Sequence, residues 1–512
     1  MLKKIYASAL FGVEASTITV EVNVSKGIGY HLVGLPDNAI KESNYRIASA
    51  LSNNGFKIPG KKVTINLAPA DVRKEGSAYD LPIAMGILAA SDQIKSEGIG
   101  DIVIMGELSL DGNLQSINGV LPITLNAKNS GFKAVIVPVQ NVQEAAIVEG
   151  ITVYGVKNIS QVIGFFDKSK PLIPYKRDIK NIFSSHFNQF DFDFSDVKGQ
   201  YGVKRCMEIA AAGGHNLLLI GPPGSGKSML AKRLSTIMPP MTMEESIETT
   251  KIHSIQGTIG GSGIITKRPF RNPHHTISDV ALVGGGQYPQ PGEISLAHNG
   301  VLFLDELPEF KRSVLEVMRQ PLEDREVTIS RAKFNITYPS SFMLVASMNP
   351  SPSGYFNNDD APVKSTPYEM QRYLSKISGP LLDRIDIHIE VNPVPFEKLA
   401  SKDPAECSSV IRSRVIKARA VQTQRFENHI GIHYNAQMQT SHIKKYCILS
   451  DASLTLLENA MKQLNLSARA YDRILKLSRT IADLEPKKNI MPHHISEAIQ
   501  YRSLDRQAWL AP

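Results

Sequence analysis

The sequence predicts an α/β protein that ends in a helical region. Three observations lead to this fold class. Residues 1–165 alternate between strand-like and helix-like segments. A second alternating region runs from Asp196 to about Val391, and its first apolar strand leads into a glycine-rich loop. From Pro393 onward, apolar residues recur with helical spacing. The chain is also too long for a single hydrophobic core, so several domains are expected.

Individual elements follow from these patterns. The strands expected in the first region are Val20–Val24, Lys62–Asn66, Asp101–Met105 and Ala134–Val137, and its helices are Ala39–Asn53 and Leu81–Ser91. The helices expected near the C-terminus are Ala452–Leu464, Ala468–Leu484 and Pro492–Ser503, with Ser467 as the N-cap of the second. The predicted domains are 1–166, a linker at 167–195, an α/β core at 196–392 and a helical lid at 393–512.

Composition limits the class of protein. Hydrophobic residues make up 42% of the 512 residues and charged residues 21%, as in ordinary globular proteins. The 57 basic side chains exceed the 49 acidic ones, which gives a net charge of +8 and a modest preference for a polyanionic partner such as DNA. No stretch reaches the roughly 18 apolar residues that a membrane span requires, so no membrane partner is expected.

The cysteines and the N-terminus bear on location. Cys206, Cys407 and Cys447 are far apart and odd in number, so the sequence predicts neither a disulfide framework nor a zinc site. The first residues carry two lysines, but Glu14 interrupts the apolar stretch that a secretion signal needs. We therefore expect a cytoplasmic protein.

One loop indicates nucleotide binding. Leu217–Ile220 is a short apolar strand, and the helical stretch Met229–Met238 follows the loop, which gives the order strand, loop, helix. Glycines let backbone N–H groups turn toward phosphate, and the helix N-terminus adds positive potential. We expect Lys227 to reach the β- and γ-phosphates of ATP and Ser228 to bind Mg²⁺. The predicted nucleotide-binding residues are Gly221, Pro222, Pro223, Gly224, Ser225, Gly226, Lys227 and Ser228.

Two later strands add groups for hydrolysis. Val301–Leu304 is apolar and ends in Asp305 and Glu306. We expect Asp305 to hold Mg²⁺ and Glu306 to activate the attacking water. A third apolar strand ends at Asn349, which resembles the first sensor of AAA+ ATPases; a turn asparagine that caps the strand is the alternative.

The AAA+ resemblance extends to two arginines. Gly379–Asp386 resembles the segment that supplies an arginine finger, so Arg384 is expected to reach the γ-phosphate held by a neighbouring subunit. A salt bridge to Asp383 or Asp386 is the structural alternative. Ser467–Ala470 resembles the second sensor, with Arg469 as its arginine and Arg473 in reserve. An arginine that acts in trans implies assembly, and a homo-hexameric ring is the family expectation.

Two basic segments resemble elements of one AAA+ branch. The stretch between Lys227 and Asp305 resembles a helix-2 insert, and Glu326–Thr337 reads as a β-hairpin before the Asn349 strand. Both resemble elements shared by magnesium-chelatase-like ATPases and the replicative helicases of archaea and eukaryotes, and in ring helicases such elements face the pore. The expected DNA contacts are Lys267, Arg268 and Arg271 in the insert and Arg331 and Lys333 in the hairpin. Solvated loops or subunit contacts are the alternatives for these cations.

The adjacent His274 and His275 invite a metal interpretation. Neighbouring side chains point in different directions, and no carboxylate or cysteine lies at ligand spacing, so no metal is expected there.

Taken together, the motifs closely resemble the YifB/ComM family of magnesium-chelatase-like AAA+ proteins over nearly the whole chain. The motifs that carry the resemblance are Gly34–Asp37, Asn66–Asp71, Asp196–Gln200, Arg271–His275 and Leu381–Asp386. The resemblance implies a hexameric ATP-dependent DNA helicase or translocase that drives branch migration during integration of transforming DNA, with recombination proteins as possible partners.

The N-terminal region resembles the Lon protease domain, a ribosomal S5 domain 2-like fold. Lon-type proteolysis needs a serine nucleophile and a lysine base. Alignment places Ala78 and Leu121 at these positions, so the domain is expected to be non-proteolytic. A shifted alignment with Ser77 and Lys128 is the alternative.

Two other functions remain open at this stage. A magnesium-chelatase- or MoxR-type remodeller of a protein partner would share the same ATP site. An ATP-dependent protease is disfavoured because both members of the dyad are replaced.

Overall fold

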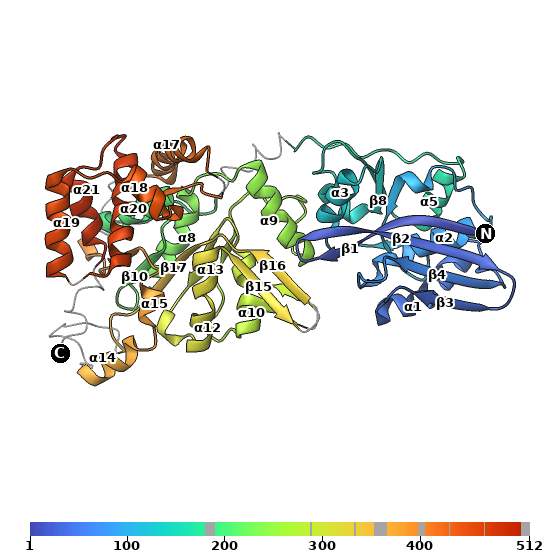
Figure 1. The fold of residues 1–512 in the computed structure, drawn as a ribbon, viewed down its shortest axis with the longest axis horizontal. Helices are drawn as coiled ribbons and strands as arrows, with labels where there is room; N and C mark the ends of the chain where they lie inside the picture. The colour runs from blue at the N-terminus through green and yellow to red at the C-terminus, as the bar shows by residue number, and fades with distance from the viewer. Residues whose placement is uncertain are drawn as a thin grey trace. The chain divides into compact units, whose positions relative to one another are not determined.

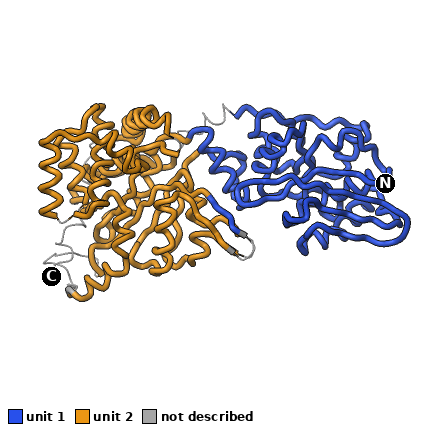
Figure 2. The backbone as a smooth tube through the Cα atoms, viewed as in Figure 1, with its two compact units in different colours: residues 1–187, 242–266, 332–338 blue, residues 188–241, 267–331, 339–512 orange. Residues whose placement is uncertain are grey.

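The structure is a computed structural model of the chain. It describes residues 1–179, 190–286, 289–331, 334–352, 366–397, 405–429, 431–464 and 466–502. The chain divides into two compact units, drawn in different colours in Figure 2. The first comprises residues 1–187, 242–266 and 332–338, and the second comprises 188–241, 267–331 and 339–512. Two segments from the middle of the sequence therefore belong with the N-terminal region, while the domain boundaries given above stay predictions.

The first unit is built on a seven-stranded mixed sheet with the strand order β3-β4-β2-β1-β5-β8-β9 (Figure 1). The pairs β1–β2 and β2–β4 are antiparallel, and the other neighbours are parallel. The predicted strands of this region are confirmed. The strands are β1 (Leu2–Phe11), β2 (Glu14–Ser25), β3 (Gly29–Val33), β4 (Lys62–Ala68), β5 (Ile102–Ile104), β8 (Ala134–Pro138) and β9 (Thr152–Val156).

The predicted helices of the first unit are also confirmed, as α1 (Asn38–Asn53) and α2 (Asp80–Ala90). Every residue of α2 is buried, which agrees with its apolar character on all sides. Its first residue, Asp80, accepts hydrogen bonds of 2.7 and 2.9 Å from the guanidinium of Arg46 on α1. Burial raises the pKa of Asp80 to about 6, although Arg46 opposes the shift. The ion pair therefore joins the two helices beneath the surface.

Helix α9 (Met243–Ile255) lies in the insert but packs within the first unit, against α3 (Val120–Asn129). Its N-cap, Thr242, forms a capping box with Glu245. The side chain of Leu121 on α3 is fully buried in this contact. The apolar cluster that α9 covers consists of Leu121, Ile147, Val148, Ile179 and Ile264, with Met243 and Ile247 packed against it.

Buried hydrogen bonds fix the same contact. Glu144 accepts from the backbone N–H of Leu121 across 2.7 Å and from the hydroxyl of Ser254 on α9. The backbone oxygen of Ser254 in turn accepts from Gly119 across 3.0 Å. Burial raises the pKa of Glu144, and these donors oppose the shift. A partly apolar, partly polar joint thus attaches the insert to the N-terminal region.

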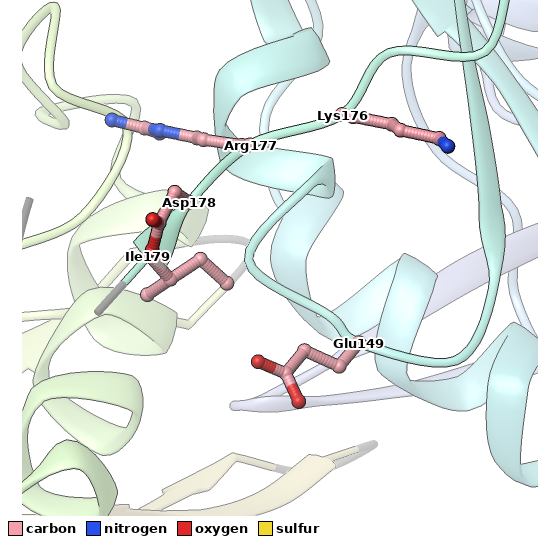
Figure 3. Close-up of a pocket in the computed structure, with 5 residues that line it drawn as sticks. All are labelled: Glu149, Lys176, Arg177, Asp178 and Ile179. Carbon is pink, nitrogen blue, oxygen red and sulfur yellow. The ribbon is translucent and has the colours of Figure 1, made fainter. Parts of the chain in front are cut away.

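Next to this joint lies an open cavity of about 410 Å³, shown in Figure 3. Its cations do not converge, because Lys176 and Arg177 extend in opposite directions. Arg177 donates instead to the backbone oxygens of Gln143, across 2.7 Å, and Ser262. We interpret Arg177 as a further tie between the insert and the N-terminal region.

The second unit contains a parallel five-stranded sheet with the order β11-β14-β17-β10-β18. Helices α7 (Tyr201–Gly213) and α8 (Lys227–Ile237) contribute to its core. The predicted hairpin is confirmed as the strand pair β15 (Glu326–Arg331) and β16 (Phe334–Pro339), and all but the last residue of β16 are counted with the first unit. The sheet strands are β10 (Leu217–Ile220), β11 (Phe270–Arg271), β14 (Val301–Leu304), β17 (Met343–Met348) and β18 (Ile387–Glu390).

The C-terminal part is helical, as predicted, and shares one hydrophobic core with this sheet. The predicted helices are confirmed as α19 (Asp451–Gln463), α20 (Ala468–Leu484) and α21 (Pro492–Gln500). Helix α20 packs against α17 (Ser408–Phe426) and α21, and α21 packs against α19 (Figure 1). Ser467 caps α20 by accepting from Ala470 across 3.2 Å, as expected. Among the described helices, none is both long enough and apolar enough to span a bilayer.

Candidate nucleotide site

The carboxyl ends of β10, β14 and β17 meet at one edge of the parallel sheet. In the register of β10 and β17, Ile220 lies opposite Met348. Gly221 and Asn349 therefore follow side by side, and the N–H of Gly221 donates to the oxygen of Met348 across 3.2 Å. Open α/β sheets bind ligands at this edge, so the fold brings the predicted site residues to the expected place.

The glycine-rich loop connects β10 to α8. Gly224 and Gly226 have φ angles of 78° and 89°, in the left-handed region that favours glycine. At Gly221, an added Cβ would lie 2.3 Å from the backbone oxygen of Val391. The buried hydroxyl of Ser225 finds no hydrogen-bond partner within the described part of the chain. The backbone of the loop can therefore surround a phosphate group, and the Ser225 hydroxyl can donate a further hydrogen bond to it.

Lys227 is the first residue of α8, and its side chain is buried. Its ammonium group donates to the backbone oxygens of Gly221, across 2.6 Å, and Pro222, across 2.9 Å, and to Oδ1 of Asn349 across 3.2 Å. Burial lowers the pKa of Lys227, and the nearby Asp305 carboxylate opposes the shift. The positively charged ammonium group of Lys227 is therefore held between the glycine-rich loop and the end of β17.

Asp305 follows β14, and both of its carboxylate oxygens accept hydrogen bonds. Because Leu304 lies opposite Ala346, the next residue, Asp305, comes beside Ser347, whose hydroxyl donates to Oδ1. The hydroxyl of Ser228 donates to Oδ2 across 2.7 Å. Hydroxyl and carboxylate oxygens are the ligands that Mg²⁺ prefers, so this pair fits the predicted metal site.

Ser347 was not singled out from the sequence. The only signal was a hydroxyl near the end of an otherwise apolar strand, β17. In the structure it holds Asp305 and accepts, across 3.3 Å, from the backbone N–H of Glu306. We therefore add it to the residues that position the acidic pair.

Glu306 has a φ of 54°, which is unusual for a residue with a side chain. Its backbone N–H donates to both Asp305 and Ser347, which holds this conformation. The side chain is 58% exposed. Backbone strain of this kind collects at functional sites, so the geometry agrees with a reactive carboxylate.

Asn349 lies at the edge of a cavity of about 460 Å³ beside the loop. Its side-chain oxygen accepts from Lys227, and its backbone oxygen accepts from the Tyr373 hydroxyl across 3.2 Å. Glu306 and Tyr373 also line this cavity. Tyr373 belongs to α14 (Pro367–Leu374). No motif in the sequence identified it as a residue of this site.

Arg384 is only 6% exposed in the single chain. Its guanidinium donates to the backbone oxygen of Pro380 across 2.6 Å and pairs with Glu323. Its ion-pair partner is thus Glu323 rather than Asp383 or Asp386, which the sequence offered as alternatives. A role across a subunit interface stays a prediction.

The two candidate lid arginines have different settings. Arg469 is 57% exposed and lies 3.5 Å from the carboxylate of Asp383. Arg473 pairs with the buried Asp386, which also lies 3.5 Å from Nδ1 of His215. Burial alone would raise the pKa of Asp386, but Arg473 and His215 hold it well below its ordinary value. Arg473 is thereby engaged in the core, and Arg469 is the more accessible of the two.

Family models and full-length relatives match this chain. The models of the magnesium chelatase subunit ChlI match residues 193–399, 20–141 and, for its C-terminal part, 405–502. The competence protein ComM of Haemophilus influenzae is 44% identical over 504 residues, which cover 98% of this chain and 97% of that protein. The chain belongs to the ComM/YifB family. The Escherichia coli member YifB is 43% identical over 509 residues, 99% of this chain and 98% of its own.

Membership in this magnesium-chelatase-like AAA+ family implies ATPase activity and agrees with the geometry above. The predicted Lon likeness of the N-terminal region is confirmed as well. The archaeal Lon protease of Methanocaldococcus jannaschii is 29% identical over 175 residues, 31% of this chain and 26% of that protein. Lon protease 2 of Bacillus subtilis is 31% identical over 125 residues, 24% of this chain and 22% of that protein.

The residues aligned with the Lon dyad in the sequence analysis are Ala78 and Leu121, and a non-proteolytic domain stays a prediction. Ala78 offers only a methyl group, and Leu121 is buried beneath α9. In the shifted alignment, Ser77 bonds to the carboxylate of Glu107, and Lys128 is exposed. The contacts of Leu121 give it a structural role in holding the insert.

The basic residues of the insert also have contacts in this ComM/YifB chain. Arg268 donates three hydrogen bonds of 2.7 to 3.0 Å to backbone carbonyls. Nε and Nη2 of Arg271 donate to the two carboxylate oxygens of Glu293, each across 2.6 Å. The Lys267 ammonium lies 5.6 Å from the ring centre of Phe190. These contacts give the tract a fixed shape, and DNA binding by it stays a prediction.

The hairpin contributes two further candidates. Arg331 ends β15, and only its backbone is described. Lys333 lies outside the described residues. For both, contact with DNA stays a prediction.

Proposed function

We propose that this chain is an ATP-driven hexameric DNA helicase or translocase that promotes branch migration when transforming DNA is integrated. The observation that carries the proposal is the full-length similarity to a competence protein, ComM, and it is supported by the hydrogen bonds of Lys227 to Asn349 and of Ser228 to Asp305. A DNA-related role agrees with the net charge of +8.

The residues of the site fit ATP and Mg²⁺. The Ser225 hydroxyl, which has no hydrogen-bond partner among the described residues, and the glycines with positive φ suit phosphate oxygens. The Ser228–Asp305 pair suits a hard cation. When bound, ATP supplies the phosphoanhydride bond that is cleaved, and Mg²⁺ offsets its charge. Lys227 binds the terminal phosphates, and Asn349 orients the attacking water. Glu306 accepts a proton from that water at its carboxylate.

Two arginines complete the proposed site. Arg384 acts on the γ-phosphate of a neighbouring subunit, which requires it to exchange Glu323 for the phosphate at the assembled interface. Arg469, exposed at the start of α20, contacts nucleotide when the helical lid closes. The action of Arg384 in trans requires the chain to assemble, and we propose the homo-hexameric ring expected from the family, with recombination proteins as partners.

DNA is proposed to bind the insert and the hairpin. Lys267, Arg268 and Arg271 lie in one short tract beside β14, and Arg331 and Lys333 belong to the hairpin. Because phosphate contacts release counterions, binding should weaken steeply as salt rises.

The test measures ATP hydrolysis with and without single-stranded and branched DNA, and unwinding of a three-strand junction. We expect DNA to stimulate hydrolysis and the junction to be resolved only with ATP. Lys227→Ala serves as the matched control and should do neither. An assembled hexamer that hydrolyses ATP without DNA stimulation and without unwinding would refute the proposal.

A second function is supported by the match to the magnesium chelatase subunit ChlI over residues 193–399. On this reading the same ATP site drives remodelling of a protein partner. Stimulation of hydrolysis by a purified protein, with no response to DNA, would favour it.

A further inference from the structure

The chain leaves the parallel sheet immediately before Asn349. Strand pairing orders β17 as far as Met348, whose backbone oxygen accepts from the N–H of Gly221 across 3.2 Å. The next backbone oxygen, that of Asn349, lies beyond the paired residues and accepts from the hydroxyl of Tyr373 across 3.2 Å. A side chain of α14 therefore fixes the first peptide group that the sheet no longer holds.

This peptide group bears on where the Asn349 side chain lies. Asparagine has only two side-chain torsions, so the position of its amide follows closely from the orientation of its own backbone. The amide oxygen accepts from Lys227 across 3.2 Å. The amide nitrogen is then the donor that Asn349 can offer to the attacking water. A rotation of the backbone at Asn349 would move this donor relative to Glu306, which lines the same cavity.

Helix α14 presents Tyr373 in a fixed position. The helix begins with a capping box, in which the hydroxyl of Thr366 accepts from the backbone N–H of Glu369 across 3.3 Å. Tyr373 is 8% exposed, so its ring is almost fully packed. Burial raises the pKa of Tyr373, although the hydrogen bond to Asn349 opposes the shift. The hydroxyl therefore keeps its proton at neutral pH and remains a donor.

A second contact joins α14 to the same edge of the sheet, but solvent reaches it. The ammonium group of Lys376 lies 3.2 Å from Oε1 of Glu309, whose backbone N–H donates to the oxygen of Glu306 across 2.8 Å. The two side chains of this ion pair are 43% and 48% exposed, and water and salt weaken pairs of this kind. The hydrogen bond from the buried Tyr373 is therefore the stronger link between α14 and the site.

We propose that Tyr373 is a positioning residue for ATP hydrolysis, whose hydroxyl holds the backbone of Asn349 so that the Asn349 amide can orient the attacking water. Tyr373 acts through Asn349 and need not contact ATP. Loss of the hydroxyl would leave a half-buried backbone oxygen without this donor and would free its peptide group to rotate. This role rests on the part proposed above for Asn349 in hydrolysis.

The test compares steady-state ATP hydrolysis by Tyr373→Phe with the wild type. Phenylalanine keeps the packed ring and removes only the hydroxyl. We expect kcat to fall by about tenfold, while KM for ATP and the affinity for a fluorescent ATP analogue stay unchanged. Tyr368→Phe is the matched control, because it makes the same change on the same helix at a side chain that is 73% exposed. It should leave kcat unchanged.

A second background separates positioning from a general effect on the fold. Asn349→Ala lacks the side chain that Tyr373 is proposed to orient, so adding Tyr373→Phe to it should lower kcat no further. Two changes whose effects on kcat multiply would show that Tyr373 acts elsewhere, and would overturn the positioning role. A wild-type kcat in Tyr373→Phe, beside a reduced kcat in Asn349→Ala, would overturn it as well.

The same variants distinguish a failure of this role from a failure of the proposed function. A wild-type kcat in Asn349→Ala would refute the part proposed for Asn349, and the role of Tyr373 would fall with it. A reduced kcat in Asn349→Ala upholds that part, and Tyr373→Phe then decides the role of Tyr373 alone. None of these measurements needs DNA, so they stand apart from the tests of stimulation and unwinding.

Discussion

The hydroxyl of Ser228 donates a hydrogen bond of 2.7 Å to Oδ2 of Asp305. This contact links the first turn of α8 to the end of β14, two elements far apart in the sequence. It joins the two groups that suit a hard cation.

Ser228→Ala should therefore weaken Mg²⁺ use more than nucleotide binding. Loss of one contact to a charged group corresponds to about 1.5 to 3 kcal/mol, or roughly a 10- to 100-fold fall in kcat/KM. Titration of hydrolysis against Mg²⁺ measures this, and Ser235→Ala, which alters a half-buried serine later in α8, is the control. An unchanged Mg²⁺ requirement would remove Ser228 from the metal site.

Glu306→Gln should bind ATP with near-normal affinity and lose turnover. The amide cannot accept the proton of the attacking water, and general bases contribute roughly 10²- to 10⁴-fold. Binding of a fluorescent ATP analogue and a single-turnover assay separate the two effects. Normal single-turnover rates would show that another group activates the water.

Leu121→Lys should detach the insert instead of restoring a Lon-type base. A charge placed in the buried cluster beneath α9 destabilises it by about 3 kcal/mol or more. Hydrogen exchange across Met243–Ile255 should accelerate, while Asn129→Lys, at the exposed end of the same helix, should leave it unchanged. Casein hydrolysis by a Leu121→Lys and Ala78→Ser double variant would contradict the structural role.

The stability of the first unit should depend on pH through Asp80. Its folded-state pKa of about 6 lies above the ordinary value of 3.8, so the folded form binds the proton more tightly. The contribution is complete below about pH 3.8 and is lost as pH rises through 6, with a limit of about 3 kcal/mol. Calorimetry of wild type and Asp80→Asn between pH 4 and 7 measures the difference. A parallel dependence in both chains would show that Asp80 has no such role.

The sequence was sufficient for the elements that local patterns specify. The loop at Gly221–Ser228 and the strand before Asp305 combine a short apolar run with residues of restricted chemistry. Their proximity also requires both strands to lie in one parallel sheet, where β17 stands between them. Helix α20 and its cap at Ser467 were likewise predictable, because spacing and capping are local properties.

The contacts that depend on register were not predictable. Ser347 beside Asp305, and His275 beside Glu306, require knowledge of which strands are neighbours and how they align. The attachment of α9 to the N-terminal region is also tertiary, since nothing in Met243–Ile255 identifies Leu121 as its partner.

The joint beneath α9 has a practical consequence for biochemistry. Met243, Ile247 and Ile264 belong to the chain that follows the phosphate loop, but the residues that cover them, such as Leu121 and Val148, come from the N-terminal region. A chain that starts after residue 187 would keep Met243, Ile247 and Ile264 but lose Leu121 and Val148. Its apolar side chains would then be exposed to solvent, and exposed apolar patches promote aggregation. Aggregation or inactivity of such a fragment would reflect that uncovered face. It would not show that the N-terminal region takes part in hydrolysis.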